Sequence, residues 1–156
     1  MVPSFKSPED ASHSWFSLVL VATQFILMAL IMLAGPFWPT HWSPQGMMVL
    51  GGVSGLWAFL AMGLRNLRAF PEIPQHGWLV VHGPYRWVRH PMYASVLVIT
   101  LVWTVEYPLP FRVALWVGLV VTLWVKLRYE ESLLVERFPE YETYRRQTKH
   151  LIPFVW

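Results

Sequence analysis

Residues 82–93 read HGPYRWVRHPMY and lie between two apolar parts of the chain. The stretch holds two prolines, two arginines, two histidines, two tyrosines and a tryptophan. It cannot lie in lipid, because Arg86 and Arg89 would lose their hydration and the prolines would leave carbonyl groups unpaired. Its fixed backbone angles and planar side chains are also unusual for a linker. We therefore expect a preformed polar pocket at a membrane surface. The alternative is a basic loop beside the membrane, which would need only the arginines.

The composition is that of a small membrane protein. The 156 residues suffice for one domain, and 55% are hydrophobic against 13% charged. Ten tryptophans and nine phenylalanines suit aromatic belts at two membrane interfaces. The net charge of +3 is better explained by basic flanks beside apolar runs than by nucleic-acid binding, which we do not expect. Cysteine is absent, which excludes disulfides, a thiol nucleophile and a zinc–thiolate site.

Four apolar runs are long enough, or nearly so, to cross a bilayer as helices: 15–34, 47–64, 91–105 and 111–125. Gly51 and Gly55 in the second run form a G-x-x-x-G pattern, which predicts close packing against another helix of the same chain. After Lys126 the apolar residues recur at helical spacing among charged ones, which predicts an amphipathic helix on the surface. The expected fold is all-α: one polytopic membrane domain over residues 1–156.

The distribution of positive charge predicts the orientation. Of the twelve Lys and Arg residues, four lie in 65–90 and six lie from 126 onward. With four spans these two segments share one face, which the positive-inside rule assigns to the cytoplasm. We expect a bacterial inner-membrane protein with both termini and the site in the cytoplasm. Segments 65–90 and 126–156 should therefore meet.

The adjacent carboxylates Glu130 and Glu131 follow the fourth apolar run directly. Neighbouring helix positions point about 100° apart, so both cannot face one site. One should face inward while the other pairs with arginine or meets solvent, and the sequence does not say which. The neighbouring aromatic residues would attract a sulfonium or quaternary ammonium group. A ligand with sulfonium, ammonium, carboxylate and purine groups, such as S-adenosylmethionine, would use all of these features.

The histidines at 76, 82, 90 and 150 do not follow a common metal-ligand spacing, so no metal site is expected. His90 is expected to donate a hydrogen bond to a ligand or to the backbone. The chain also lacks the usual nucleotide-binding and hydrolase motifs.

Three groups of residues form a known pattern: Gly83-Pro84-Tyr85, then Arg89-His90-Pro91-Met92-Tyr93, and later Glu130-Glu131 with aromatic residues after it. With these residues the sequence resembles the isoprenylcysteine carboxyl methyltransferase family of integral membrane enzymes, over roughly residues 64–156. Phospholipid methyltransferases and the C-terminal part of membrane sterol reductases share related versions. The resemblance therefore indicates a superfamily better than a substrate.

The resemblance implies an S-adenosylmethionine-dependent methyltransferase whose cofactor pocket is closed by the C-terminal segment. By position, the residues implied to line the cofactor site are Leu79, Val80, Tyr85, His90, Pro91, Met92 and Tyr93. Glu130 would bind the methionine part, and either Arg128 or Lys126 would lie near the methyl acceptor. A carboxylate acceptor needs no general base, whereas an amine or phenol would need one, with Glu131 or His90 as the first candidates. The predicted catalytic residues are accordingly Arg128 and Glu131.

Three functions are consistent with these features. The first is methyl transfer to a lipophilic acceptor in the membrane, such as the carboxylate of a prenylcysteine-like molecule or another lipid. The second is an NADPH-dependent membrane reductase of the sterol type. The third is a non-enzymatic protein whose basic segments bind anionic lipid headgroups. Replacing Tyr85 or Glu130 should abolish ligand binding under the two enzyme hypotheses and do little under the third.

Overall fold

The computed structural model describes residues 15–64, 66, 67, 71 and 77–152. Parts of the predicted polar segment, with Arg65, Arg68 and His76, lie outside the described residues. The helices in chain order are α1 (Trp15–Leu33), α2 (Trp42–Met62), the 3-10 helix η2 (Gly83–Arg86), α3 (Pro91–Glu106), α4 (Pro110–Arg137) and α5 (Tyr141–Gln147). Within the described part of the chain no β-strand occurs, and one isolated bridge joins Val88 to Lys149.

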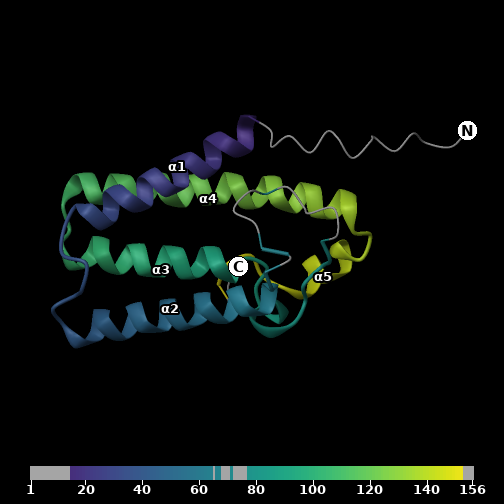
Figure 1. The fold of residues 1–156 in the computed structure, drawn as a ribbon, viewed down its shortest axis with the longest axis horizontal. Coiled ribbons are helices and arrows are strands. Elements are labelled where there is room, and N and C mark those ends of the chain that lie inside the picture. The colour runs from purple at the N-terminus through teal and green to yellow at the C-terminus, as the bar shows by residue number, and fades with distance from the viewer. Residues whose placement is uncertain (1–14, 65, 68–70, 72–76, 153–156) are drawn as a thin grey trace, which may run out of the picture.

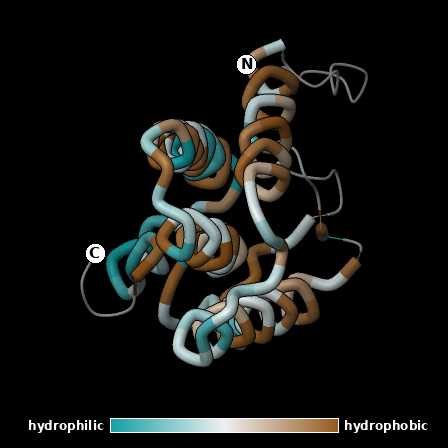
Figure 2. The backbone as a smooth tube through the Cα atoms, turned by 90° about the vertical axis from the view of Figure 1, so that its left-hand side faces the viewer, coloured by the Kyte–Doolittle hydropathy of each residue, from teal (hydrophilic) through white to brown (hydrophobic). Residues whose placement is uncertain are grey.

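The four long helices lie side by side, with α3 between α2 and α4 and with α1 over α4 (Figure 1). The main contacts are those of α2 with α3 and of α1 with α4, and α3 also contacts both α1 and α4. The core between them contains Ile31, Met48, Val102, Trp103, Leu119 and Leu123. Large hydrophobic side chains such as Leu50, Leu60 and Val121 point outward, and Figure 2 shows hydrophobic residues along all the long helices.

The predicted all-helical membrane fold is confirmed. Helices α1, α2 and α4 are long and apolar enough to cross a membrane, and α3 is a shorter apolar helix of 16 residues. The G-x-x-x-G prediction is confirmed as well. A Cβ atom added to Gly55 would lie 2.6 Å from the Oγ of Ser95 on α3, and one added to Gly51 would lie 3.0 Å from the side chain of Ile99. The two glycines therefore allow α2 to approach α3 closely.

The helix that contains the fourth predicted span extends well beyond residue 125. Helix α4 continues without a break for 28 residues, about 42 Å at ~1.5 Å per residue, which exceeds the ~30 Å hydrocarbon core. No helix breaker follows Val125, and the next residues are good helix formers. The helix ends at Arg137, ahead of Pro139. The amphipathic segment predicted after Lys126 is therefore mainly the extension of α4, and α5 is a separate short helix.

Candidate active site

The turn before α3 is shaped by its glycine and prolines. Gly83 has a φ of 61°, which favours glycine, and a Cβ atom there would lie 3.1 Å from the Cβ of Ala61. Pro91 occupies the first turn of α3, where its missing N–H costs no hydrogen bond. The turn directs Tyr85 into the protein, where it packs with Ala58 and Val80.

The two polar segments meet at the end of the bundle that carries α5, as predicted. The backbone N–H of Arg89 donates to the carbonyl oxygen of Lys149 at 2.8 Å, and that of His90 donates to the carbonyl of His150 at 3.1 Å. In the other direction the N–H of Lys149 donates to the carbonyl of Trp87 at 3.1 Å. The C-terminal segment is therefore held against the start of α3 by main-chain hydrogen bonds.

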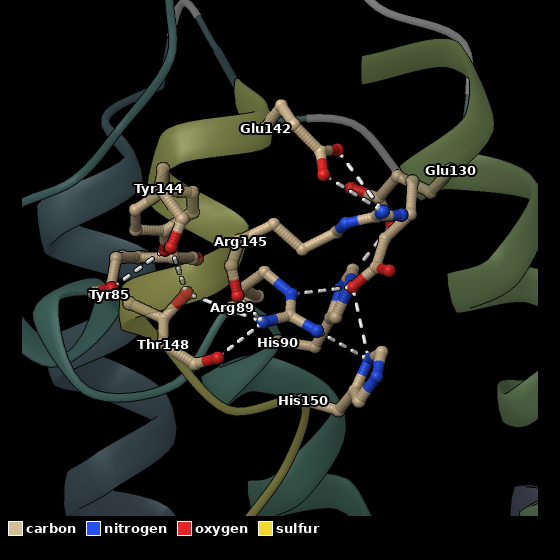
Figure 3. Close-up of polar contacts among 10 residues, drawn as sticks. Tyr85, Arg89, His90, Glu130, Glu142, Tyr144, Arg145, Thr148 and His150 are labelled. Atoms are coloured by element: carbon tan, nitrogen blue, oxygen red, sulfur yellow. Dashed lines mark hydrogen bonds and ion pairs between the residues drawn. The ribbon is translucent and has the colours of Figure 1, made fainter. Parts of the chain in front are cut away.

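A buried ion pair between Arg89 and Glu131 joins these segments to α4. The Nε of Arg89 donates to the Oε1 of Glu131 at 2.7 Å, and each side chain is only 4% exposed. The guanidinium also donates to the carbonyl oxygens of Arg145 and Thr148, and its Nη2 lies 2.9 Å from the Nδ1 of His150 (Figure 3). One arginine thus connects α3, α4 and the C-terminal segment.

The environment of Glu131 favours its ionised form. Burial raises the pKa of this carboxyl, but the hydrogen bonds and charges of His90 and Arg89 outweigh burial and lower the pKa to about 2. The Nε2 of His90 and the Nδ1 of His150 each lie 3.1 Å from Oε1. The pKa of His150 is lowered, chiefly because burial disfavours its charged form. Glu131 is therefore an ionised, multiply hydrogen-bonded carboxylate and a weak base.

A cavity lies beside this ion pair, and most of the predicted cofactor residues line it. These are Leu79, Val80, Tyr85, His90, Met92, Tyr93 and Glu130. Pro91 is buried in the same turn but does not line the cavity. The side chain of Glu130 is 26% exposed, and its Oε2 accepts a hydrogen bond from the hydroxyl of Tyr93 at 2.8 Å. The question left open by the sequence thus has an answer: Glu130 faces the cavity and Glu131 pairs with Arg89.

The cavity is also lined by residues that were not among those predicted to bind the cofactor: Met62, Asn66, Leu67, Pro71, Trp78, Arg89, Leu134, Phe138, Tyr141 and Tyr144. Leu134 and Phe138 lie four and eight positions after Glu130, so helical spacing from that residue would have found them. Asn66 holds Trp78 in the cavity wall, because its side chain exchanges hydrogen bonds with the backbone N–H and C=O of Trp78, at 3.2 and 2.8 Å.

A second cavity forms a groove between α1 and α2, floored by α3. Its lining includes Gln24, Phe25, Gly55, Leu56, Phe59, Ser95, Val96 and Lys126. It shares Leu67, Met92 and Tyr93 with the first cavity, so the two cavities adjoin. Most of its walls are apolar. Its polar side chains include the pair formed by Lys126 and Gln24: the Nζ of Lys126 donates to the Oε1 of Gln24 at 2.7 Å, and Lys126 is only 2% exposed.

Tyr93 stands at the junction of the two cavities. Its ring stacks on that of His90, with centroids 5.3 Å apart, and the Nζ of Lys126 lies 5.3 Å from its ring centroid. Arg128, by contrast, lines neither cavity. It is exposed, and its guanidinium lies 4.8 Å from the ring centroid of Trp124. Of the two cations predicted near a methyl acceptor, the structure brings Lys126 to the cavities and leaves Arg128 outside them.

Comparison with known proteins gives one family. A family model described as phospholipid methyltransferase matches residues 39–141. This range contains α2, η2, α3 and α4, and with them every residue predicted to line the cofactor site. Helix α1 precedes the matched range. A search of curated proteins found no match.

Proposed function

The chain belongs to the phospholipid methyltransferase family, and we propose on that basis that it transfers a methyl group from S-adenosylmethionine to a lipophilic acceptor within the membrane. The observation that carries this proposal is the pair of adjoining cavities. One is lined by polar as well as apolar residues and includes Glu130, the other is a mainly apolar groove between helices, and Tyr93 is common to both. A soluble cofactor and a lipid could thus reach each other from different directions.

The residues of the first cavity fit the proposed cofactor. Glu130 is the single acidic side chain among the described residues that line it, and it would bind the ammonium group. Tyr85 and Tyr93 offer aromatic faces that stabilise a sulfonium charge. Apolar side chains such as Leu79 and Met92 suit the purine. When bound, S-adenosylmethionine would supply an electrophilic methyl group on its sulfonium sulfur.

The protein would act mainly by positioning. A methyl displacement needs the acceptor in line with the sulfonium, and orientation of this kind supplies much of the rate. Tyr93 is held by Glu130 on one side and stacked on His90, so its ring is fixed at the boundary between cofactor and acceptor. Glu131 would act as a positioning residue, because it orients His90 and Arg89. The catalytic role predicted for Glu131, like that of Arg128, stays a prediction.

The groove supports an acceptor with an anionic group. Lys126 is the basic residue among the described residues that line it, and Gln24 orients the ammonium. An anionic oxygen can accept a methyl group without a general base. An amine would need a base, and the low pKa of Glu131 makes that carboxylate unsuitable. We therefore favour a carboxylate or similar amphiphile, as in isoprenylcysteine carboxyl methyltransferase, over an amine lipid. We also propose that the end of the bundle that carries the first cavity faces the cytoplasm, because most Lys and Arg residues belong to the two segments that meet there.

The family assignment favours this function over an NADPH-dependent reductase, which neither the cavities nor the comparisons support. A direct test offers the purified protein S-adenosylmethionine with a labelled methyl group and three amphiphiles of equal chain length, ending in a carboxylate, a primary amine or a neutral alcohol. We expect label in the carboxylate as an alkali-labile ester. Label in the amine alone would overturn the acceptor class. If no methyl group is transferred to these amphiphiles or to extracted membrane lipids, the proposed methyltransferase activity is contradicted.

A further inference from the structure

The two tyrosines of α5, Tyr141 and Tyr144, differ in the hydrogen bonding of their hydroxyl groups. Tyr141 and Tyr144 are both buried, both line the first cavity, and their ring centroids are 5.7 Å apart. The hydroxyl of Tyr144 donates to the carbonyl oxygen of Tyr85 at 2.6 Å. The hydroxyl of Tyr141 is also buried, yet it has no hydrogen-bond partner among the described residues.

An unpaired buried hydroxyl is unfavourable, because the group loses its hydrogen bonds to water and gains none from the protein. Phenylalanine would fill the same space at position 141 without that cost. Burial, aided by the charge of Glu131, raises the pKa of Tyr141, so its hydroxyl is a neutral donor at physiological pH. Tyr141 is thus a hydrogen-bond donor that has no acceptor in the part of the chain that the structure describes.

The turn before α5 places Tyr141 in the wall of the first cavity. Pro139 ends α4, and the N–H of Tyr141 donates to the carbonyl of Phe138 at 3.0 Å, which closes the turn. Phe138 and Leu134 line the same cavity, so the turn continues the cavity wall. Tyr141 is 1% exposed and does not line the groove between α1 and α2. Its partner should therefore be sought in the cofactor cavity and not in the acceptor groove.

We propose that the Tyr141 hydroxyl donates a hydrogen bond to an oxygen or nitrogen atom of the bound cofactor, so that α5 is part of the binding site and not only its cover. This inference rests on the proposed function, because it takes S-adenosylmethionine as the occupant of the cavity. It assigns to Tyr141 a binding role and to Tyr144 a structural one.

The test compares Tyr141→Phe with Tyr144→Phe, two variants that each remove one hydroxyl from the same helix. For each we would measure thermal unfolding without ligand and the Kd for S-adenosylmethionine by calorimetry. Tyr141→Phe should unfold at the same temperature as the wild type or higher, and should bind about tenfold more weakly. Tyr144→Phe should unfold at a lower temperature, because it loses the bond to Tyr85.

Three results would overturn the inference. If Tyr141→Phe binds the cofactor like the wild type, the hydroxyl makes no contact with it. If that variant is destabilised without ligand, the hydroxyl has a structural partner such as an ordered water. If the wild type itself binds no S-adenosylmethionine, the proposed function fails and this inference fails with it. The first two results leave the proposed function intact, so the two failures are distinguishable.

Discussion

Replacing Glu131 by glutamine should destabilise the protein more than any other single loss of a carboxylate at this end of the bundle. Glutamine keeps the size and shape of the side chain but removes the negative charge. Arg89 would remain buried, with its guanidinium 2.7 Å from a neutral oxygen, and His90 would lose its anionic partner. The contacts of Arg89 with the C-terminal segment depend on this pair, so the segment should loosen with it.

The magnitude follows from the pKa of Glu131. The difference between an ordinary value of 4.5 and one of about 2 corresponds to ~3 kcal/mol of stability. Removing one partner of a buried ion pair typically costs about 3–5 kcal/mol, which agrees with the value obtained from the pKa. Because folding lowers this pKa, the stabilisation is fully present above pH 4.5 and is lost as the pH falls through about 2. The glutamine variant should therefore differ most from the wild type at neutral pH.

The assay is thermal unfolding in detergent at pH 7, followed by tryptophan fluorescence. Glu131→Gln should lower the unfolding temperature by on the order of 10 °C. The matched control is Glu142→Gln, because the Glu142 side chain is 41% exposed and pairs with Arg145 at the surface. Exposed pairs contribute ~0–1 kcal/mol, so this variant should change little. Equal stability of the two variants at pH 7, or a difference that does not shrink in acid, would refute the reasoning.

Two further predictions concern the groove and the helix packing. Lys126→Met should weaken the binding of a long-chain carboxylate at least tenfold without changing the Kd for S-adenosylmethionine. Arg128→Met should change neither affinity by more than about twofold, because Arg128 lies outside both cavities. Equal effects of the two variants would contradict the placement of Lys126 at the acceptor. Gly55→Ala should destabilise the protein by about 1–3 kcal/mol, because its Cβ would lie 2.6 Å from the Oγ of Ser95, whereas Gly52→Ala meets open space and serves as the control in the same unfolding assay.

The meeting of the two polar segments was predictable from charge alone. Lys and Arg gather in two segments that four spans must place on one face, and the contact of Arg89 with Glu131 follows that arrangement. Helical geometry also predicted that only one of Glu130 and Glu131 faces the site. Which of the two faces the site depends on the rotation of α4 relative to α3. That rotation is fixed by contacts between residues far apart in the sequence. The hydrogen bond from Tyr93 to Glu130 is such a contact.

Which of Lys126 and Arg128 lies near the acceptor likewise depends on how α4 packs against the other helices. Two helix positions apart, their side chains point about 200° apart, so at most one enters the groove. The partner of Lys126 was visible in the sequence as the single amide in an uncharged apolar run, Gln24. Its role required knowing that α1 packs on α4. The continuation of α4 to Arg137 was not predicted, because hydropathy falls at residue 126 while helix propensity does not.

The most direct measurement for the proposed methyltransferase site is calorimetric titration of the detergent-purified protein with S-adenosylmethionine. Glu130→Gln is the test variant, because Glu130 is the acidic group that faces the cavity. Glu136→Gln, an exposed carboxylate on the same helix, is its control, and NADPH is the competing ligand. We predict micromolar binding by the wild type and the control, at least tenfold weaker binding by Glu130→Gln, and no binding of NADPH. Full binding by Glu130→Gln, or none by folded wild-type protein, would contradict the site proposed for the cofactor.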